Sequence, residues 1–466
     1  MEDKARVTGK LLVEGEIELE SPLIIGGGEK KEEVDITVIK DAEGRPYIPA
    51  TSLAGVLRHY FYQNADLSGI ENPEQLIYFW GEDCKDYKDR KEDVYQSALF
   101  ISDATTCSEA VISVRDGVAL ADCGIAADEE KFEYEVVEPE TSFRLKMEVN
   151  LREKYEKDLF KKILFFLVKA LREGRIAVGA MTTKGFGRCR LVNEKVYELD
   201  FSQNEDVIAW LSEEYTSKQQ IFIDDIATFH VEANDFAIDA FMEIKNSLIV
   251  RSYSGNPDDP DAVHITSRGK PVLPGTSVKG AIRQRAKRII NTLGGNGEQL
   301  VKELFGDVDK KTKEKIKSRV IVEETEIRNA VPEIQHRIKI DRFTGGTIKT
   351  ALFDTMPLWP VNGEKEMVHI RLTIKGGREG YKDWEAGLLL LILKDLWNED
   401  LAIGGEKNIG RGVLRGLGAE ISFKDKKVVI TRKDSNKVHI SGNGELLENF
   451  VQTLVNKCQG KVVDYA

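Results

Sequence analysis

Two glycine-rich loops, one in each half of the chain, combine residue types that could bind a phosphate group. They read Gly179-Ala-Met-Thr-Thr-Lys-Gly-Phe-Gly-Arg188 and Gly404-Gly-Glu-Lys-Asn-Ile-Gly-Arg-Gly412. Glycine tolerates positive φ and lets backbone N–H groups approach an anion closely. A tight turn before a last strand is the alternative interpretation. Neither loop has the Gly-Lys-Ser/Thr of a P-loop or the spacing of a dinucleotide site, so we expect no nucleotide cofactor.

A second candidate site is a basic stretch in the second half of the chain. Residues 262–297 contain no acidic side chain. The formal net charge is −12, but phosphate contacts depend on the local potential at the binding face. The stretch therefore suits a nucleic-acid backbone, although a solvated helix face would have the same composition. Its cations are Arg268, Lys270, Lys279, Arg283, Arg285, Lys287 and Arg288.

An internal duplication relates these motifs. The segment Pro46-Tyr-Ile-Pro-Ala-Thr-Ser-Leu-Ala-Gly-Val-Leu-Arg58 matches Pro271-Val-Leu-Pro-Gly-Thr-Ser-Val-Lys-Gly-Ala-Ile-Arg283 at an offset of 225 (271 − 46). The same offset pairs Gly81 with Gly306 and Asp116 with Asp341, and it pairs three glycines of each glycine-rich loop. One constant shift over so long a stretch predicts two homologous domains.

Each copy has the same order of expected elements. A strand with alternating apolar residues (10–19; 237–250) precedes the Pro-x-x-Pro-x-Thr-Ser segment, whose prolines keep the chain extended and whose Thr or Ser could cap the next helix. An amphipathic helix later leads to a short strand and the glycine-rich loop. The order predicts an α+β fold of two tandem ferredoxin-like (RRM-like) domains with insertions. We expect domains at 1–200 and 233–420, a linker at 201–232 with a short helix, and a small C-terminal extension of two strands and a helix at 421–466.

Composition limits the class of protein. Hydrophobic residues make up 41% and charged residues 31% of the 466, as in an ordinary globular protein. No signal peptide is recognised, and the longest apolar runs are too short to cross a bilayer, so no membrane partner is expected. The five cysteines are scattered and no pair is spaced as CxxC. This argues against a disulfide framework and a zinc site, and it favours a reducing cytoplasm.

Together, the Pro-x-x-Pro-Gly-Thr-Ser-x-Lys-Gly-x-x-Arg pattern, the aspartate before it and the terminal glycine-rich loop resemble the RAMP superfamily. More closely, they resemble backbone subunits of type III CRISPR–Cas effector complexes. The resemblance covers both copies. It implies an RRM-like core, binding of CRISPR guide RNA and target RNA, contact with other CRISPR effector subunits, and a β-hairpin thumb. In many such subunits an acidic loop residue cuts the target RNA.

The resemblance assigns the catalytic role to an aspartate in the loop before the proline-rich segment. The matching residues are Asp35 and Asp261, which align after a one-residue gap (261 − 35 = 226). A carboxylate, with or without a divalent cation such as Mg²⁺ or Mn²⁺, could orient attack of the RNA 2′-OH on its own phosphate. A solvated acidic loop is the alternative. His264 could be a helper base or an inert surface histidine.

The copies differ where RNA contacts are expected. Ala50 and Ala54 of the first stand opposite Gly275 and Lys279 of the second, and Arg251 has only glycine opposite it. The segment Asp341-Arg-Phe-Thr-Gly-Gly346 resembles the family at the hairpin tip, where aromatic and Arg side chains could wedge against bases. Residues expected to contact RNA are Arg58, Lys184, Gly185, Gly187, Arg188, Arg251, Lys279, Arg283, Arg342, Phe343, Lys407, Gly410 and Arg411.

The sequence therefore predicts a guide-RNA-binding subunit that acts as an endoribonuclease on target RNA within a ribonucleoprotein complex. Two alternatives remain open. The first is a structural scaffold that holds guide RNA without cutting. The second is a standalone guide-RNA-processing endonuclease, although the histidine that such an enzyme often uses is not duplicated here, because none of the six histidines occupies a repeated position.

Overall fold

The computed structural model describes most of the chain and divides it into two compact units. The first unit comprises residues 1–114, 133–182 and 186–231, and the second comprises 115–132, 183–185 and 232–466. Cys84 and Cys123 lie outside the described residues, whereas Cys107, Cys189 and Cys458 are free thiols. The described residues are 6–28, 34–82, 95–120, 126–215, 218–231, 234–253, 259–308, 314–361, 363–364, 366–433 and 437–460, without the side chains of 119–120, 126–130 and 350.

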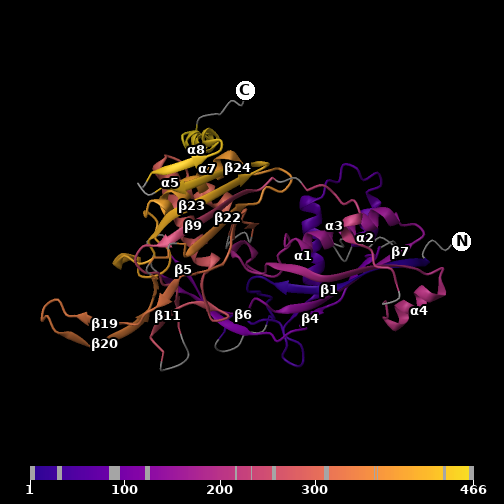
Figure 1. Ribbon diagram of the computed structural model, residues 1–466, viewed down its shortest axis with the longest axis horizontal. Coiled ribbons are helices and arrows are strands. Elements are labelled where there is room, and N and C mark those ends of the chain that lie inside the picture. Colours follow the sequence, from indigo (N-terminus) through magenta and orange to yellow (C-terminus); the bar gives the residue numbers. More distant parts are fainter. Residues whose placement is uncertain are drawn as a thin grey trace. The chain divides into compact units, whose positions relative to one another are not determined.

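The first unit is built on a four-stranded antiparallel sheet in the order β3-β7-β1-β8. The strands are β1 (Val7–Leu19), β3 (Leu99–Ile101), β7 (Ser142–Arg152) and β8 (Cys189–Asp200). Along the chain these are the first to fourth main strands, with α1 (Ala50–Asn64) after the first and α3 (Lys157–Arg172) before the last (Figure 1). This is the βαββαβ topology of a ferredoxin-like fold, so the predicted fold class is confirmed.

The second unit repeats that sheet and enlarges it. Its order is β16-β22-β9-β23-β24-β25, in which β16 (Val320–Val322), β22 (Val368–Ile374), β9 (Phe236–Ile244) and β23 (Leu414–Phe423) correspond to the four strands of the first unit. The helices α5 (Gly275–Thr292) and α7 (Asp383–Trp397) correspond to α1 and α3. β9 ends six residues before the expected Val250, because the chain turns at Lys245 and Asn246.

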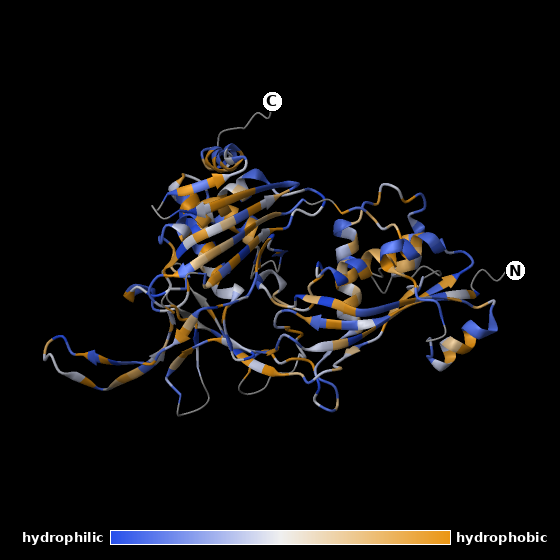
Figure 2. Ribbon diagram, viewed as in Figure 1, coloured by the Kyte–Doolittle hydropathy of each residue, from blue (hydrophilic) through white to orange (hydrophobic). Residues whose placement is uncertain are grey.

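Both cores lie between a sheet and its helices. Along β9 and β22 every second side chain is buried, and Figure 2 shows the resulting alternation of hydrophobic and hydrophilic residues along the strands. Period-two alternation buries one face of a sheet. In the first unit α3 supplies nine buried residues to the same core as Leu11 and Val13 of β1. In the described part of the chain no helix is both long and apolar enough to span a membrane.

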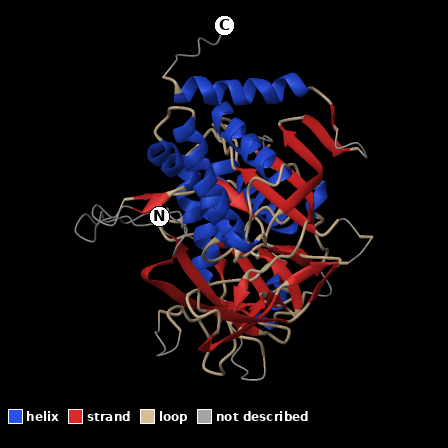
Figure 3. Ribbon diagram, turned by 90° about the vertical axis from the view of Figure 1, so that its left-hand side faces the viewer, coloured by secondary structure: helices blue, strands red, loops and turns tan. Residues whose placement is uncertain are grey.

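The segments outside the two repeats continue these sheets and cores. In 201–232 the chain forms α4 (Asn204–Ser212) and η2 (Ile223–Asp225), and Ile223 and Phe229 are buried in the core of the first unit. After residue 420 come β24 (Lys426–Arg432), β25 (Val438–Ser441) and α8 (Gly444–Cys458), the expected two strands and helix. Figures 1 and 3 show α8 beside the other helices near the C-terminus, and Phe450 joins the second core.

Both repeats also protect one edge of the sheet. On the outer side of β8, Gln220 forms an isolated antiparallel bridge with Tyr197, and the Ile221 N–H donates to the Val196 carbonyl at 2.8 Å. On the corresponding side of β23, β24 pairs with residues 418–423 of that strand. Different segments therefore cover part of each of two equivalent edges.

The helix starts differ from the expected capping. Pro49 and Pro274 are the N-cap residues of α1 and α5, with nearly the same φ and ψ, so Thr51, Ser52, Thr276 and Ser277 lie within the first turn and do not cap it. The prediction of a Thr or Ser cap was wrong because a proline in extended conformation leads directly into the helix. The Ala50 N–H instead donates to Asp103 Oδ1 at 2.7 Å.

The offset between the repeats changes after α2 (Glu74–Trp80) and α6 (Gly297–Phe305). These helices end at Gly81 and Gly306, with φ near 80° and ψ 163° in both. Gly81 faces Ser97 and Gly306 faces Ser318, so the offset falls to 221 (318 − 97). The pairing of Asp116 with Asp341 was therefore wrong: Asp116 lies within β5 (Ile112–Leu120), whereas Asp341 begins a hairpin turn.

The remaining elements are mostly short strands around the main sheets. β5 and β6 pair as one hairpin, and β19 and β20 as another that extends from the second unit (Figure 1). Their bounds are β2 (Tyr47–Ile48), β4 (Ala104–Thr105), β6 (Ala126–Val137), η1 (Thr182–Lys184), β10 (Arg251–Ser252), β11 (Ala262–His264), β12 (Thr266–Ser267), β13 (Lys270–Leu273), β14 (Asp307–Val308), β15 (Lys315–Ile316), β17 (Thr325–Glu326), β18 (Ala330–Pro332), β19 (Gln335–Ile340), β20 (Thr347–Met356), β21 (Leu358–Pro360) and η3 (Lys407–Ile409).

Candidate nucleic-acid interface

The two candidate catalytic aspartates occupy the same structural position in their repeats. The Glu133 N–H donates to Asp35 Oδ2 at 2.9 Å, and the Asp354 N–H donates to Asp261 Oδ2 at 2.9 Å. Both donors lie in the second strand of a hairpin, β6 or β20, and both aspartates are exposed. The alignment with a one-residue gap thus pairs two aspartates that each accept an equivalent backbone hydrogen bond in their own repeat.

This bond orients each carboxylate without occupying both of its oxygens. One oxygen of each aspartate is fixed by the backbone, and among the described residues no donor reaches Oδ1 of Asp35 or Asp261. An exposed carboxylate oxygen can accept the proton of a substrate hydroxyl. No group of three or more His, Cys, Asp and Glu side chains in the described part of the chain could hold a metal ion. A divalent cation here would need RNA phosphates and water as its other ligands.

Three arginines surround a single carboxylate in the second unit. Glu406 of the second glycine-rich loop is bound by Arg251 at 2.7 Å, Arg337 at 3.0 Å and Arg411 at 2.8 Å. Arg251 lies in β10, which pairs with the strand that follows Asp261, and Arg337 lies in β19 of the same small sheet. Three positive charges facing one negative charge leave a local positive surplus, as a phosphate-binding face requires.

The exposure of the three arginines is graded. Arg251 is 43% exposed, Arg337 24% and Arg411 3%. Burial and the neighbouring Arg337 and Arg251 act to lower the pKa of Arg411, and Glu406 opposes them. Nη1 of Arg411 is buried and has no hydrogen-bond partner in the described part of the chain. Arg251 is therefore the member best placed to meet a ligand from solvent.

The first repeat lacks this cluster. At the offset of 225, Met181 corresponds to Glu406 and Phe186 to Arg411; Met181 and Glu406 share a φ near 55°. Phe186 is buried and lies edge-on to Tyr134, with ring centroids 6.1 Å apart. At the position of Arg411 the first repeat therefore has a buried aromatic ring in place of a member of the ionic cluster.

A second basic group lies at the start of α5. Lys279 is buried, and its Nζ donates to Thr183 O, Ser318 Oγ and Val320 O at 2.7–2.9 Å. Burial lowers the pKa of Lys279 to about 7, assisted by the positive charges of Lys184 and Arg283. Within the described residues no carboxylate pairs with Lys184 or Arg283. These two half-buried cations can thus attract an anion. Lys279 holds the loop that carries Lys184 in place through its hydrogen bond to Thr183 O.

Other residues of the basic stretch are neutralised by acids from elsewhere in the chain. Arg285 pairs with Asp395 at 2.6 Å, and Lys287 pairs with Glu298 at 2.7 Å. Arg285 and Lys287 therefore lie on an ordinary ion-paired helix face, the alternative to a nucleic-acid contact. The lack of acids within 262–297 did not reveal the pairing, because both partners come from outside that stretch.

The glycines of the loops fill different roles. A Cβ on Gly187 or Gly412 would overlap the carbonyl of Val178 or Ile403, so these two glycines are needed for close packing inside the loop. Gly185 lies against the backbone of Glu324 within the second unit. A Cβ on Gly410 would have only a side-chain nitrogen of Asn246 within 4 Å. Of the glycines expected to contact RNA, Gly410 is the one with open space around it.

The remaining candidates are spread over both units. Arg188 pairs with Glu20 at 3.0 Å, the Arg58 guanidinium lies 5.9 Å from the Tyr62 ring centroid, and Lys407 is exposed. At the hairpin tip, Arg342 is exposed and Phe343 is 100% exposed. Arg337 and Glu406 were not predicted from the sequence as RNA-binding residues. The charge of Glu406 inside a basic, glycine-rich loop was a signal that could have indicated the cluster.

His264 is a core residue, so neither earlier interpretation of it was right. It is 4% exposed. Its Nδ1 accepts the Val250 N–H at 3.2 Å, and its Nε2 lies 2.9 Å from the Val272 carbonyl oxygen. These partners require a neutral ring with the proton on Nε2. The imidazole therefore holds β11 to the segments on either side of it.

We expect His264 to make the second unit sensitive to acid. Burial lowers the pKa of His264 to about 4, below its ordinary 6.5, so the unfolded chain takes up a proton first as pH falls. The free energy of unfolding should decrease between about pH 6.5 and pH 4, by an amount on the order of 3 kcal/mol. Urea denaturation at several pH values would measure the decrease, which His264→Asn should reduce and the exposed control His439→Asn should not.

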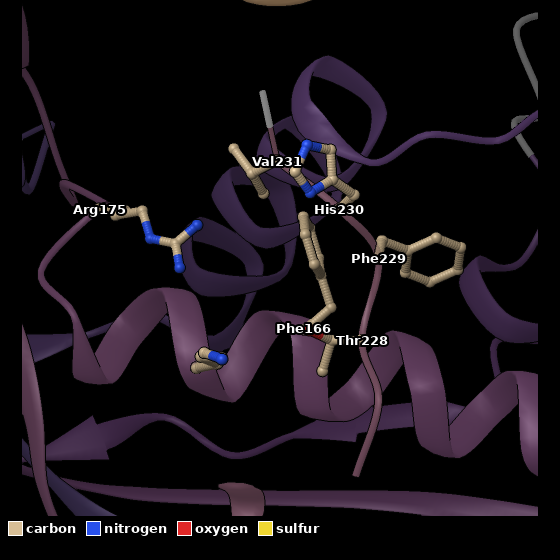
Figure 4. Close-up of a pocket in the computed structure, with 7 residues that line it drawn as sticks. Phe166, Arg175, Thr228, Phe229, His230 and Val231 are labelled. Atoms are coloured by element: carbon tan, nitrogen blue, oxygen red, sulfur yellow. The ribbon is translucent and has the colours of Figure 1, made fainter. Parts of the chain in front are cut away.

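A separate pocket lies in the first unit. It has a volume of about 350 Å³ and is formed by α3 and the segment that ends at Val231. Figure 4 shows Arg175, His230 and Val231 around it, with Phe166 and Phe229 at its side. None of the residues predicted to contact RNA lines this pocket, and its wall lies partly in the expected linker.

Comparison with known families supports the duplication. The family model of the RAMP superfamily matches residues 16–190 and again residues 241–415. The two matches are displaced by 225 residues at both ends (241 − 16; 415 − 190), the offset seen in the sequence repeat. Together they cover most of the chain. No curated protein matches it.

Proposed function

Since the chain belongs to the RAMP superfamily, whose members take part in CRISPR-associated RNA-binding complexes, we propose that it is a double backbone subunit of a type III CRISPR effector. In this role it binds guide RNA along both repeats in the cytoplasm and contacts other effector subunits. Target RNA that pairs with the guide is cut beside Asp35 and Asp261.

The observation that carries the RNA-binding part is the arginine cluster around Glu406. Three guanidinium groups share one carboxylate within the second unit. Guanidinium groups bind phosphate through paired, directional N–H donors. The exposed Phe343 at the end of the β19–β20 hairpin adds an aromatic surface for an unstacked base. Backbone contacts of this kind predict binding that tolerates changes of spacer sequence.

The catalytic part rests on the shared position of the two aspartates. The 2′-oxygen of the target attacks the adjacent phosphorus, the 2′-OH proton passes to the free carboxylate oxygen, and the bond to the 5′-oxygen breaks as that oxygen takes a proton from water. The products are a 2′,3′-cyclic phosphate and a 5′-hydroxyl. The hydrogen bonds from Glu133 and Asp354 would hold each carboxylate in place for this step.

Guide-RNA affinity tests the proposal. We expect Arg251→Ala with Arg337→Ala to weaken binding of a guide RNA to the purified chain about tenfold or more. The salt dependence of log Kd should also become shallower, by about two phosphate contacts. Fluorescence anisotropy at several salt concentrations would measure both. The control is Lys427→Ala, a 57% exposed lysine on β24, which should leave the affinity unchanged. Binding that is insensitive to salt would contradict the proposal.

A further inference from the structure

A short segment of the first glycine-rich loop is fitted closely to the start of α5. The segment Thr183–Gly185 belongs to the second compact unit. A Cβ on Gly275 would overlap the carbonyl oxygens of Lys184 and Val322, and a Cβ on Gly185 would lie 2.5 Å from the Glu324 nitrogen. Two backbones therefore approach each other where only glycine leaves room on both sides.

Lys279 completes this fit. Its buried ammonium group donates to the carbonyl of Thr183 at 2.9 Å and also to Ser318 and Val320 of its own repeat. The lysine thus joins the loop to the strand beneath it. The recognition element on α5 is a helix that starts with glycine and has lysine four residues later, in the sequence Gly275-Thr-Ser-Val-Lys279.

The second glycine-rich loop has the same shape but no such contact. Its η3 turn corresponds to η1 at the offset of 225, and Gly410 has φ 85° where Gly185 has 91°. A Cβ on Gly410 would meet only the Asn246 side chain, at 3.8 Å. Ile409 replaces Lys184 and is 52% exposed. Among the described residues, this preformed loop has no helix start against it.

We propose that the segment Lys407–Gly410 docks onto a partner protein at a helix that begins Gly-Thr-Ser-x-Lys after an extended proline. The partner's glycine would face Gly410, and its lysine would donate to the Asn408 carbonyl, as Lys279 donates to that of Thr183. Ile409 suits this role because it brings no positive charge beside the partner's lysine. The interface is heterologous, since loop and helix start are different surfaces.

A second copy of this chain cannot be that partner. The helix start of the first repeat has Ala50 and Ala54 at the positions of Gly275 and Lys279. The methyl group of Ala50 fills the space that a docked loop carbonyl needs, and Ala54 offers no ammonium group. The Ala50 N–H is also already bound by Asp103. The chain therefore presents an open loop and a closed helix start, which prevents it from polymerising through this contact.

Restoring the two missing residues tests the proposal by gain of function. A chain carrying Ala50→Gly, Ala54→Lys and Gly410→Val has the helix start but a blocked loop. Mixed with the wild-type chain, it is expected to form a one-to-one complex in analytical ultracentrifugation. Kd should become at least tenfold weaker when the otherwise wild-type chain carries Gly410→Val, because its loop is then blocked. The same loss is expected when the variant carries Ala54→Met in place of Ala54→Lys. Absence of a complex with a folded variant would overturn the proposal.

A second measurement uses the natural sequence of the partner. A photo-crosslinking amino acid at position 409, in the chain within its assembled complex, should capture a peptide from a helix start with the Gly-Thr-Ser-x-Lys pattern. Capture of any other peptide would overturn the proposal. If the wild-type chain self-associates and Gly410→Val abolishes it, the exclusion of a second copy is wrong. Neither readout depends on RNA cleavage, so both stand apart from the proposed catalytic role.

Discussion

Alanine at Asp35 or Asp261 is expected to remove one of two cuts from a target RNA paired to a bound guide, and alanine at both is expected to remove both cuts. Loss of a positioned proton acceptor reduces the rate about 10²–10⁴-fold, so each band should fall to background in end-labelled RNA. The assay uses the assembled complex, with and without Mg²⁺ or Mn²⁺.

Two controls separate charge from loop geometry. Asparagine at position 35 or 261 keeps an oxygen for the backbone N–H of Glu133 or Asp354 and removes only the charge. Asp259→Ala removes a carboxylate two residues before Asp261 and should not change cleavage. If cutting persists in the double alanine variant, or if wild type never cuts bound target, the protein is a scaffold and the catalytic assignment is wrong.

The second large effect concerns stability. Arg115 and Glu324 form a bidentate ion pair inside the second unit, with N···O distances of 2.6 and 3.2 Å, and their side chains are 2% and 6% exposed. Glu324→Ala leaves a guanidinium group buried without its carboxylate. We expect this change to lower the free energy of unfolding by about 3–5 kcal/mol, measured from the urea midpoint at constant m value.

The expected cost comes from burial rather than from the ion pair itself. Replacing both partners, as in Arg115→Met with Glu324→Leu, should restore most of the lost stability, because neither variant side chain then carries an unpaired buried charge. Arg45→Ala provides the exposed comparison. That arginine is 57% exposed and pairs with Asp41, so its loss should leave the urea midpoint nearly unchanged. A similar effect for the two pairs would contradict the argument.

The fold could be predicted from the sequence because each expected strand and helix occurs twice, once in each repeat. Strand alternation, the amphipathic helices and the constant offset of 225 together indicated the ferredoxin-like order. The gap that aligned Asp35 with Asp261 was also informative, since both accept the same backbone hydrogen bond. The prediction failed where the connection after α6 is shorter than that after α2, because a fixed offset cannot detect a local deletion.

Side-chain partners were harder to predict than elements. Lys279 reads as an exposed helix cation, yet three acceptors from two distant segments enclose it. His264 reads as a loop residue, yet its ring joins two backbone groups in the core. Arg251 and Arg411 were predicted to contact RNA, but Arg337 was not. A β-hairpin places Arg337 beside Glu406 only after the strands pair. These contacts depend on tertiary packing, which periodicity in a sequence does not report.

The covered edges of β8 and β23 restrict how this protein can associate. A partner that extended either sheet by β-augmentation would have to displace Gln220 and Ile221 from β8, or the paired strand β24 from β23. An extended peptide that imitates a strand should therefore be a poor inhibitor of assembly at these edges. The same coverage shortens two templates on which chains could join into fibrils while the protein is being made.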